Sequence, residues 1–388
     1  MSCSTKVRNI GLDILRLIAV LLVLGRHLHL PPEPGWFLYT WQTGGWVGVD
    51  IFFVLSGFLV SGLLFCEYKD NGTVDLKRFL IRRGLKIYPA FYALIAVTLA
   101  GLMLRDNSIS IKALLGEIFF IQNYLGGLWN HTWSLAVEEH FYLGIAILFA
   151  LLIPQKKAVL DPFSKIPLIF LIVALFCLSA RIANLTLYEE YSHRWFLFGT
   201  HIRIDSLMFG VLLSYLWHFK NLNTLVVKLR GGILCSIAIL LLLPAFIFPL
   251  EQYKAISIVG VILFYLGSGA LLLFAIRFSS SSNRFWLLCG SLGASSYSIY
   301  LWHMPVSTWG WWIVKRLTGV ESFASYFAFT ILGSLAVGVI MNKVLEWPVL
   351  KLRNQYFPAA INTDSIRPTQ TTAANLDMIF KVKENGKN

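Results

Sequence analysis

The feature that most constrains this chain is a succession of apolar runs, each about as long as a membrane is thick. A membrane-spanning helix needs about 20 predominantly apolar residues. Only 14% of the 388 residues are charged, whereas roughly 25% are charged in a soluble domain. The sequence therefore predicts an all-α fold, a polytopic transmembrane helical bundle, and excludes a soluble enzyme. We expect ten spans, approximately Ile10–Leu30, Gly45–Phe65, Ile87–Leu104, Trp133–Ile153, Ile166–Ile182, Ile204–Phe219, Gly231–Leu250, Ala255–Ile276, Leu292–Trp312 and Phe323–Leu345.

The basic residues determine the expected orientation. Although the net charge is +13, the Lys and Arg residues form short clusters in alternate loops, which is the pattern of topology signals rather than of a nucleic-acid surface. The positive-inside rule then predicts a multi-pass protein of the cell (inner) membrane with both termini in the cytoplasm. We expect a transmembrane domain over residues 1–353, a polar, disordered cytoplasmic tail over 354–388, and no appended soluble domain.

The first span contains ionisable residues, which are costly inside a membrane and are by default candidates for function. Asp13 and Arg16 are three residues apart and can pair on one helix face. Arg16 and His27 are eleven residues apart, which places both on the same face about 16 Å apart along the axis. His29 points about 200° around the helix from His27.

Four further spans carry ionisable residues at a matching depth, in the half of the bundle predicted to face outward. A structural alternative is that these are scattered ion pairs that brace the helices. Because five spans contribute to the same half, we instead expect a polar cavity there. The residues are Asp50, Glu138, Glu139, His140, Arg203, Asp205 and His303.

A separate basic cluster precedes the third span on the predicted cytoplasmic side. It contains Arg82, Arg83 and Lys86 within the segment LKRFLIRRGLKIYP. One interpretation is a topology determinant beside anionic headgroups. The other is a clamp for a polyphosphate, because Arg side chains match phosphate oxygens. The residues alone leave both open.

These segments together resemble the acyltransferase 3 family, whose members O-acylate glycans and related molecules in membranes. The resemblance extends over residues 8–350, and Lys86 stands where the family usually has the second Arg of an Arg-x-x-Arg motif. It implies an acyl-CoA co-substrate, most simply acetyl-CoA, no permanently bound cofactor, and an acceptor met at the outer half. The matching stretches are Leu12–His27, Gly48–Phe58, Arg82–Pro89, Trp133–Tyr142, Arg203–Asp205 and Ser296–Pro305.

Acyl transfer to a hydroxyl needs a general base and a group that orients it. We expect His27 to be the base, because imidazole titrates near neutrality, and Glu138 or Glu139 to be its carboxylate partner. Arg16 is expected to meet the arm of acyl-CoA or to hold the first helix through Asp13.

The remaining roles follow from the resemblance. The CoA phosphates are expected at the basic cluster, and no metal site is suggested. An acyl-histidine relay at His27 and direct transfer to the acceptor both remain open. The candidates for the phosphates are Arg82, Arg83 and Lys86, and those for acceptor binding or helix bracing are Asp50, Arg203, Asp205 and His303.

The function expected is therefore transfer of an acyl group from acyl-CoA to a hydroxyl of a cell-surface glycan or a lipid-linked saccharide. A small-molecule acceptor such as a macrolide is an alternative. A different class of protein, a secondary transporter or flippase, also places charged residues in its spans, but it leaves the basic cluster at Arg82–Lys86 without an explanation.

Overall fold

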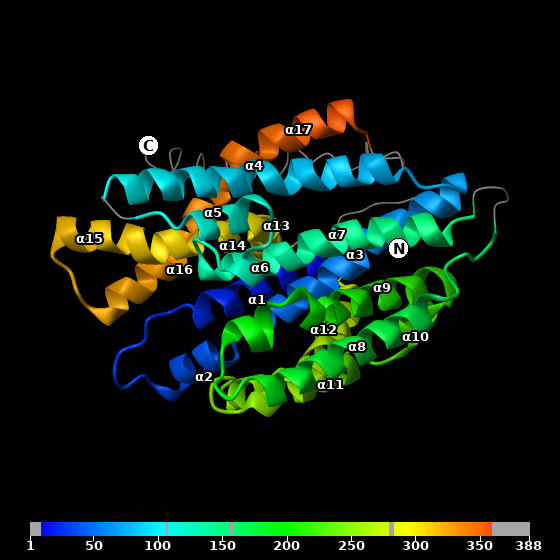
Figure 1. Ribbon diagram of the computed structural model, residues 1–388, viewed down its shortest axis with the longest axis horizontal. Coiled ribbons are helices and arrows are strands. Elements are labelled where there is room, and N and C mark those ends of the chain that lie inside the picture. The colour runs from blue at the N-terminus through cyan, green and yellow to red at the C-terminus, as the bar shows by residue number, and fades with distance from the viewer. Residues whose placement is uncertain (1–8, 106–107, 155–158, 279–282, 359–388) are drawn as a thin grey trace.

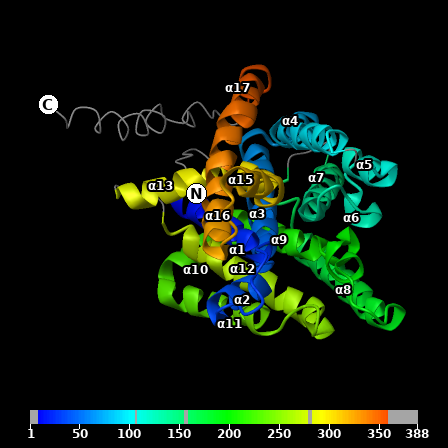
Figure 2. The ribbon, with the colours of Figure 1, turned by 90° about the vertical axis from the view of Figure 1, so that its left-hand side faces the viewer.

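The computed structural model describes residues 9–105, 108–154, 159–278 and 283–358. Over these residues every regular element is helical, so the predicted all-α fold is confirmed. Figure 1 shows most of the long helices lying along the long axis of the molecule, as expected of helices that cross a bilayer together. Figure 2 looks along that axis and shows α1 and α3 near the middle of the bundle, with α13 projecting from one side.

The chain builds the bundle from helices of very different lengths. The short elements connect the long ones or break them, and two of the breaks are π-helical (η5 and η6). The helices are α1 (Ile10–Arg26), α2 (Trp36–Gly44), α3 (Val47–Asn71), α4 (Leu76–Met103), α5 (Ile111–Ile118), α6 (Gln122–Leu125), η1 (Asn130–Thr132), α7 (Trp133–Leu152), α8 (Ile166–Leu187), η2 (Arg194–Phe198), η3 (Thr200–Ile202), α9 (Ile204–Phe219), α10 (Leu222–Lys228), α11 (Gly231–Ile247), η4 (Lys254–Ser257), α12 (Val259–Ala275), α13 (Arg284–Ala294), α14 (Ser296–Pro305), η5 (Val306–Gly310), α15 (Trp311–Thr318), α16 (Phe323–Met341), η6 (Asn342–Glu346) and α17 (Trp347–Tyr356).

The number of helices long enough to cross a membrane is smaller than predicted. All ten predicted segments fall on helices, yet only five helices within the described ranges reach spanning length and apolarity, or six if the bent pair α10 and α11 is one span. The reason is that several apolar segments form short or interrupted helices. Helix α1 has 17 residues, and the predicted span Leu292–Trp312 is divided among α13, α14, η5 and α15.

Helix α3 lies at the core of the bundle and packs closely on α9. A Cβ atom on Gly57 would lie 2.0 Å from the carbonyl oxygen of Leu207, and one on Gly210 would lie 2.3 Å from that of Val54. Small residues allow this backbone approach, which drives helix association where the surrounding lipid is itself apolar. The approach fixes how α3 presents its other faces to the rest of the bundle.

Helix α8 shows the opposite pattern at the periphery. Its apolar side chains remain exposed, among them Leu168, Leu171, Ile172 and Phe176. An exposed apolar surface of this kind in a membrane protein faces lipid. The protein is thus a multi-pass membrane protein, with α3 in its interior and α8 at its edge.

The boundary between the helical domain and the predicted C-terminal tail lies slightly later in the chain than expected. Helix α17 continues to Tyr356, so the first residues assigned to a tail are helical. The rest of the predicted tail, from residue 359 onward, lies outside the described residues, as do residues 1–8.

Candidate active site

Two of the cavities formed by the described residues lie beside α1. The first, of about 450 Å³, opens beside the C-terminal end of α1 and is called the His27 cavity here. Its wall combines polar groups with the rings of Trp46, Trp133 and Phe198. The polar lining residues include Arg26, His27, Gln42, Asn130, His193 and Glu251.

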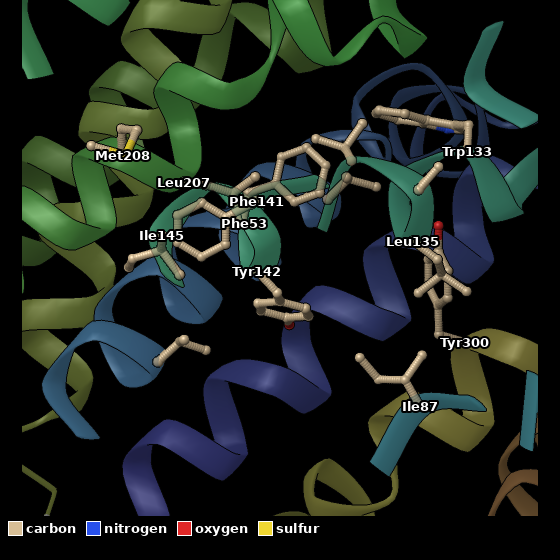
Figure 3. Packing of buried hydrophobic residues seen from close by; sticks show 14 of the residues in the cluster. Phe53, Ile87, Trp133, Leu135, Phe141, Tyr142, Ile145, Leu207, Met208 and Tyr300 are labelled. Atoms are coloured by element: carbon tan, nitrogen blue, oxygen red, sulfur yellow. The ribbon is translucent and has the colours of Figure 1, made fainter. Parts of the chain in front are cut away.

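The second cavity, of about 340 Å³, is called the basic cavity. Three cations line it, Arg16, Arg83 and Lys86, together with one carboxylate, Glu138. The rest of its wall is mainly apolar, and Figure 3 shows part of it in the side chains labelled Phe53, Ile87, Leu135, Tyr142 and Tyr300.

The two cavities share part of their walls. Val49 of α3 and Tyr300 of α14 line both. The Tyr300 hydroxyl donates to the main-chain oxygen of His131, 2.6 Å away, and accepts from the Ser134 hydroxyl at the same distance. Ser134 itself lines the basic cavity. Val49 and Tyr300 therefore form the partition between the two cavities.

His27 lies at the end of α1, against a second histidine. Its Nδ1 atom is 3.0 Å from the carbonyl oxygen of Val23 and 3.2 Å from Nε2 of His303. The His303 ring is 1% exposed and its Nδ1 is 2.5 Å from the carbonyl oxygen of Tyr300. His303 is therefore in contact with the expected base and is not among the residues that line either cavity.

These contacts assign the proton positions of both rings. A carbonyl oxygen only accepts, so Nδ1 of His303 carries hydrogen and its neutral ring accepts at Nε2. Nδ1 of His27 must then donate, to Val23 and to His303. This leaves the lone pair of His27 on Nε2. The ring lines the His27 cavity and is held in the tautomer that a general base requires.

A third histidine, His131, was not among the residues singled out from the sequence. It lies in the turn η1 before α7, and its ring centroid is 4.8 Å from that of His303 and 6.5 Å from that of His27. Its Nε2 is 3.2 Å from the carbonyl oxygen of Leu301. Its position next to the segment WSLAVEEHFY, at the same end as His27, was the available signal.

The prediction that Glu138 or Glu139 is the carboxylate partner of His27 is wrong. Glu138 accepts a hydrogen bond from Tyr142, 2.7 Å away, and lines the basic cavity. Glu139 accepts from Tyr88 of α4 at 2.9 Å. Depth along the bundle alone suggested the pairing, but α7 turns both carboxylates away from His27, and the orienting contacts come from Val23 and His303 instead.

The basic cluster is divided by the rotation of α4. Arg83 and Lys86, three residues apart, line the basic cavity beside Arg16, which is also 2.5 Å from Asp13. Arg82 lies outside that wall, because its guanidinium donates to the main-chain oxygen of Phe357 beyond α17. Successive helical residues differ by about 100° in direction, so neighbours in the sequence face different surroundings.

Three residues expected at an acceptor site lie in buried ion pairs instead. Arg203 donates to Asp50 at 2.7 Å, and both side chains are 0% exposed. Asp205 pairs with Arg181 of α8 in the same way. None of the three lines a cavity that the structure describes. They connect α3, α8 and α9, which fits the bracing alternative.

The entrance of the His27 cavity carries a smaller ion-pair network. Glu251, in the loop after α11, accepts from Arg26 and lies 3.2 Å from Nε2 of His193. The hydrogen bond from His193 and the charge of Arg26 lower the pKa of the Glu251 carboxyl to about 2. This carboxylate is therefore ionised throughout the physiological range.

Within the part of the chain that the structure describes, no group of three His, Cys, Asp or Glu side chains has the arrangement of a metal site. The site instead offers an imidazole with a lone pair at one cavity and three cations at the next. That combination suits proton transfer beside an anionic ligand.

Comparison with known proteins agrees with this chemistry. The model of a family described as an acyltransferase domain matches residues 9–342. A Staphylococcus aureus protein named "Putative O-acetyltransferase SACOL0978" is 35% identical over 329 residues, which cover 78% of this chain and 51% of that protein. No solved structure matches the chain significantly.

Two further relatives have more specific names. The peptidoglycan O-acetyltransferase OatA of Listeria monocytogenes is 30% identical over 77% of this chain and 49% of its own length. The Bacillus subtilis protein named "Putative peptidoglycan O-acetyltransferase YrhL" is 29% identical over 76% of this chain and 48% of its own. The chain thus spans about half the length of the curated relatives it matches.

Proposed function

The chain belongs to the acyltransferase 3 family, and from that premise we propose that it transfers an acetyl group from acetyl-CoA to a hydroxyl of a cell-surface glycan. The observation that carries the proposal is the adjacency of two cavities, one lined by His27 and the other by three cations. Each supplies one half of what the reaction needs.

The basic cavity suits the donor. CoA carries phosphates at one end and a thioester at the other, joined by a thin, largely neutral arm. Arg16, Arg83 and Lys86 provide the cations, and the guanidinium of Arg83 is also held 5.7 Å from the ring of Tyr142. Past them the wall becomes apolar toward Phe52 and Phe53. A phosphate end at the cations therefore leaves the thioester end directed toward Val49 and Tyr300.

His27 suits the proton transfer. The acceptor hydroxyl oxygen attacks the thioester carbonyl carbon while its proton passes to Nε2 of His27. The tetrahedral intermediate then loses the thiolate, the C–S bond breaks, and the proton on His27 passes to the sulfur, giving an ester and free CoA. During this cycle Nδ1 of His27 keeps its hydrogen and its bonds to Val23 and His303. In this direct transfer no acyl-histidine forms.

The His27 cavity suits a saccharide acceptor. Its wall pairs aromatic rings, Trp46, Trp133 and Tyr39, with hydrogen-bonding groups such as Gln42 and Asn130. A sugar presents apolar C–H faces and a rim of hydroxyls, which such a wall contacts together. The names of the relatives OatA and YrhL favour a peptidoglycan acceptor for this chain.

The distribution of basic residues also indicates from which side of the membrane each substrate binds. Most of the basic loops adjoin the Arg16 end of the bundle, and the positive-inside rule assigns that end to the cytoplasm. The donor is then met from the cytoplasmic side of the cell membrane and the acceptor from the other side.

The test is the release of free CoA from acetyl-CoA by membranes that contain the protein, with N,N′,N″-triacetylchitotriose added as a probe acceptor. We expect acceptor-dependent release, which the His27→Ala variant loses by on the order of 10²–10⁴-fold. No release above membranes without the protein contradicts the proposal. A transporter or flippase gives that result.

A matched control is His29→Ala. His29 is exposed, and its Nδ1 shares a hydrogen bond of 2.9 Å with the hydroxyl of Tyr326 in α16. It does not line the His27 cavity, so we expect wild-type release. If CoA release falls equally in both variants, the cause is disruption of the end of α1, and the proposed role of His27 is contradicted.

A further inference from the structure

The partition between the two cavities is made of one aliphatic and one aromatic side chain. Val49 is 7% exposed and Tyr300 is 5% exposed, and each contributes to both walls. On the His27 side the wall combines polar and aromatic residues, and on the basic side Phe52 packs edge-to-face on Tyr300 with ring centroids 6.1 Å apart. An acyl group that moves from the basic cavity to the His27 cavity passes the wall to which both residues contribute.

Both sides of this passage are held in place by the surrounding structure. The Tyr300 hydroxyl is held by Ser134 and by the main-chain oxygen of His131, and the main-chain oxygen of Tyr300 accepts from His303. The ring is thus fixed at both ends. Val49 follows Gly48, whose Cβ position would be 2.3 Å from the carbonyl oxygen of Ala19, so α3 is pressed against α1 and does not withdraw.

From this geometry we propose that Val49 and Tyr300 form a selectivity filter that limits the length of the acyl group this protein transfers. The inference rests on the proposed acyl transfer. The carbonyl carbon must reach the hydroxyl that His27 deprotonates, and the substituent on that carbon passes the same opening. A methyl group passes most easily, and each added methylene meets the isopropyl group of Val49.

The width of the opening depends on the volume of the Val49 side chain. The expected change in selectivity between acyl groups can therefore be estimated from the number of carbon atoms added or removed. One methylene more or less in a tight apolar site changes discrimination between substrates by on the order of 10-fold or more. Removing two methyl carbons from Val49 therefore opens the filter, and adding one carbon narrows it. The chemistry at His27 is the same in each case, because the reacting atoms do not change.

The experiment compares CoA release from acetyl-, propionyl- and butyryl-CoA by the full-length protein in membranes. For Val49→Ala we expect the propionyl-to-acetyl ratio to rise on the order of tenfold. For Val49→Ile we expect the ratio to fall. The matched control is Val54→Ala, which makes the same deletion on the same helix at a buried position that lines neither cavity, and its ratio should equal that of the wild type.

The outcomes separate this inference from the proposed function. If wild-type membranes release no CoA from any donor, the proposed function fails. If the wild type is active but Val49→Ala, Val49→Ile and Val54→Ala share one ratio, the filter is wrong while the transfer stands. If Val49→Ala does not accumulate, Val49→Ile decides alone, and an unchanged ratio in that variant overturns the inference.

Discussion

Two sets of charged side chains lie inside this helical bundle, and they differ in what they face. The first set, Asp50 with Arg203 and Asp205 with Arg181, is fully enclosed, and each charge meets an opposite one. The second set, Arg16, Arg83 and Lys86, lines the basic cavity, where the one carboxylate in the wall is Glu138. In an enclosed pair the two charges balance each other, whereas an excess of cations around a cavity attracts an anion.

The comparison shows that an ionisable residue in a membrane segment is not by itself evidence of a ligand site. The enclosed set consists of two Arg–Asp pairs, whereas the cavity-lining set consists of cations. What distinguishes them is the presence of a cavity and the local balance of charge.

The largest effect is expected from breaking an enclosed pair. Asp50→Ala leaves the guanidinium of Arg203 buried without its partner, a change that costs about 3–5 kcal/mol in buried ion pairs. We expect a strong loss of folded protein, measured as the amount in membranes and the melting temperature in detergent. Activity per folded molecule should stay near that of the wild type. A normal yield of inactive protein would place Asp50 in the site instead.

A smaller effect is expected from removing the group that orients the base. His303→Leu deletes one of the two acceptors for Nδ1 of His27, and we expect kcat to fall on the order of tenfold to hundredfold, as when an orienting outer group is lost from other sites. His303→Gln retains an acceptor and should recover part of the rate. If Gln and Leu are equally inactive, His303 has only a packing role.

The next effect concerns the cavity-lining cations. Arg83→Ala should raise KM for acetyl-CoA on the order of tenfold with little change in kcat, because the contact exists equally in the ground state and the transition state. The matched control is Arg82→Ala, whose guanidinium points to the main chain of Phe357. A larger KM effect in Arg82→Ala than in Arg83→Ala reverses the assignment of the cavity wall.

The smallest effect is expected at the entrance of the His27 cavity. Glu251→Gln removes a partly exposed ion pair, a type typically worth below about 1 kcal/mol. Because the folded pKa of Glu251, about 2, lies below the ordinary 4.5, the stabilisation is complete above about pH 4.5 and is lost as the pH falls toward 2. The melting temperatures of wild type and variant should differ slightly at pH 7 and converge near pH 2. A gap that widens on acidification contradicts the pairing.

The sequence predicted the helical class and one face of the first helix shared by Arg16 and His27. Arg16 and His27 share that face through helical periodicity, and each lines one of the two cavities. Local spacing was sufficient for this, because His27 caps the C-terminal end of the helix that carries Arg16.

The remaining features depend on contacts between distant segments. His303 reaches His27 only because α14 packs on α1, 276 residues away along the chain. Glu138 had the expected depth, but the rotation of α7 decides which cavity it faces. The difference between Arg82 and Arg83 likewise depends on where α17 lies against α4. Depth can be read from position in a span, whereas rotation and helix packing are set by the whole bundle.

The central claim is that donor binding and proton transfer belong to two adjacent cavities. The most direct test is to measure by calorimetry the equilibrium affinity of purified His27→Ala protein for acetyl-CoA. The claim predicts wild-type affinity together with turnover reduced on the order of 10²–10⁴-fold. Loss of acetyl-CoA binding in His27→Ala, or turnover at the wild-type rate, would contradict it.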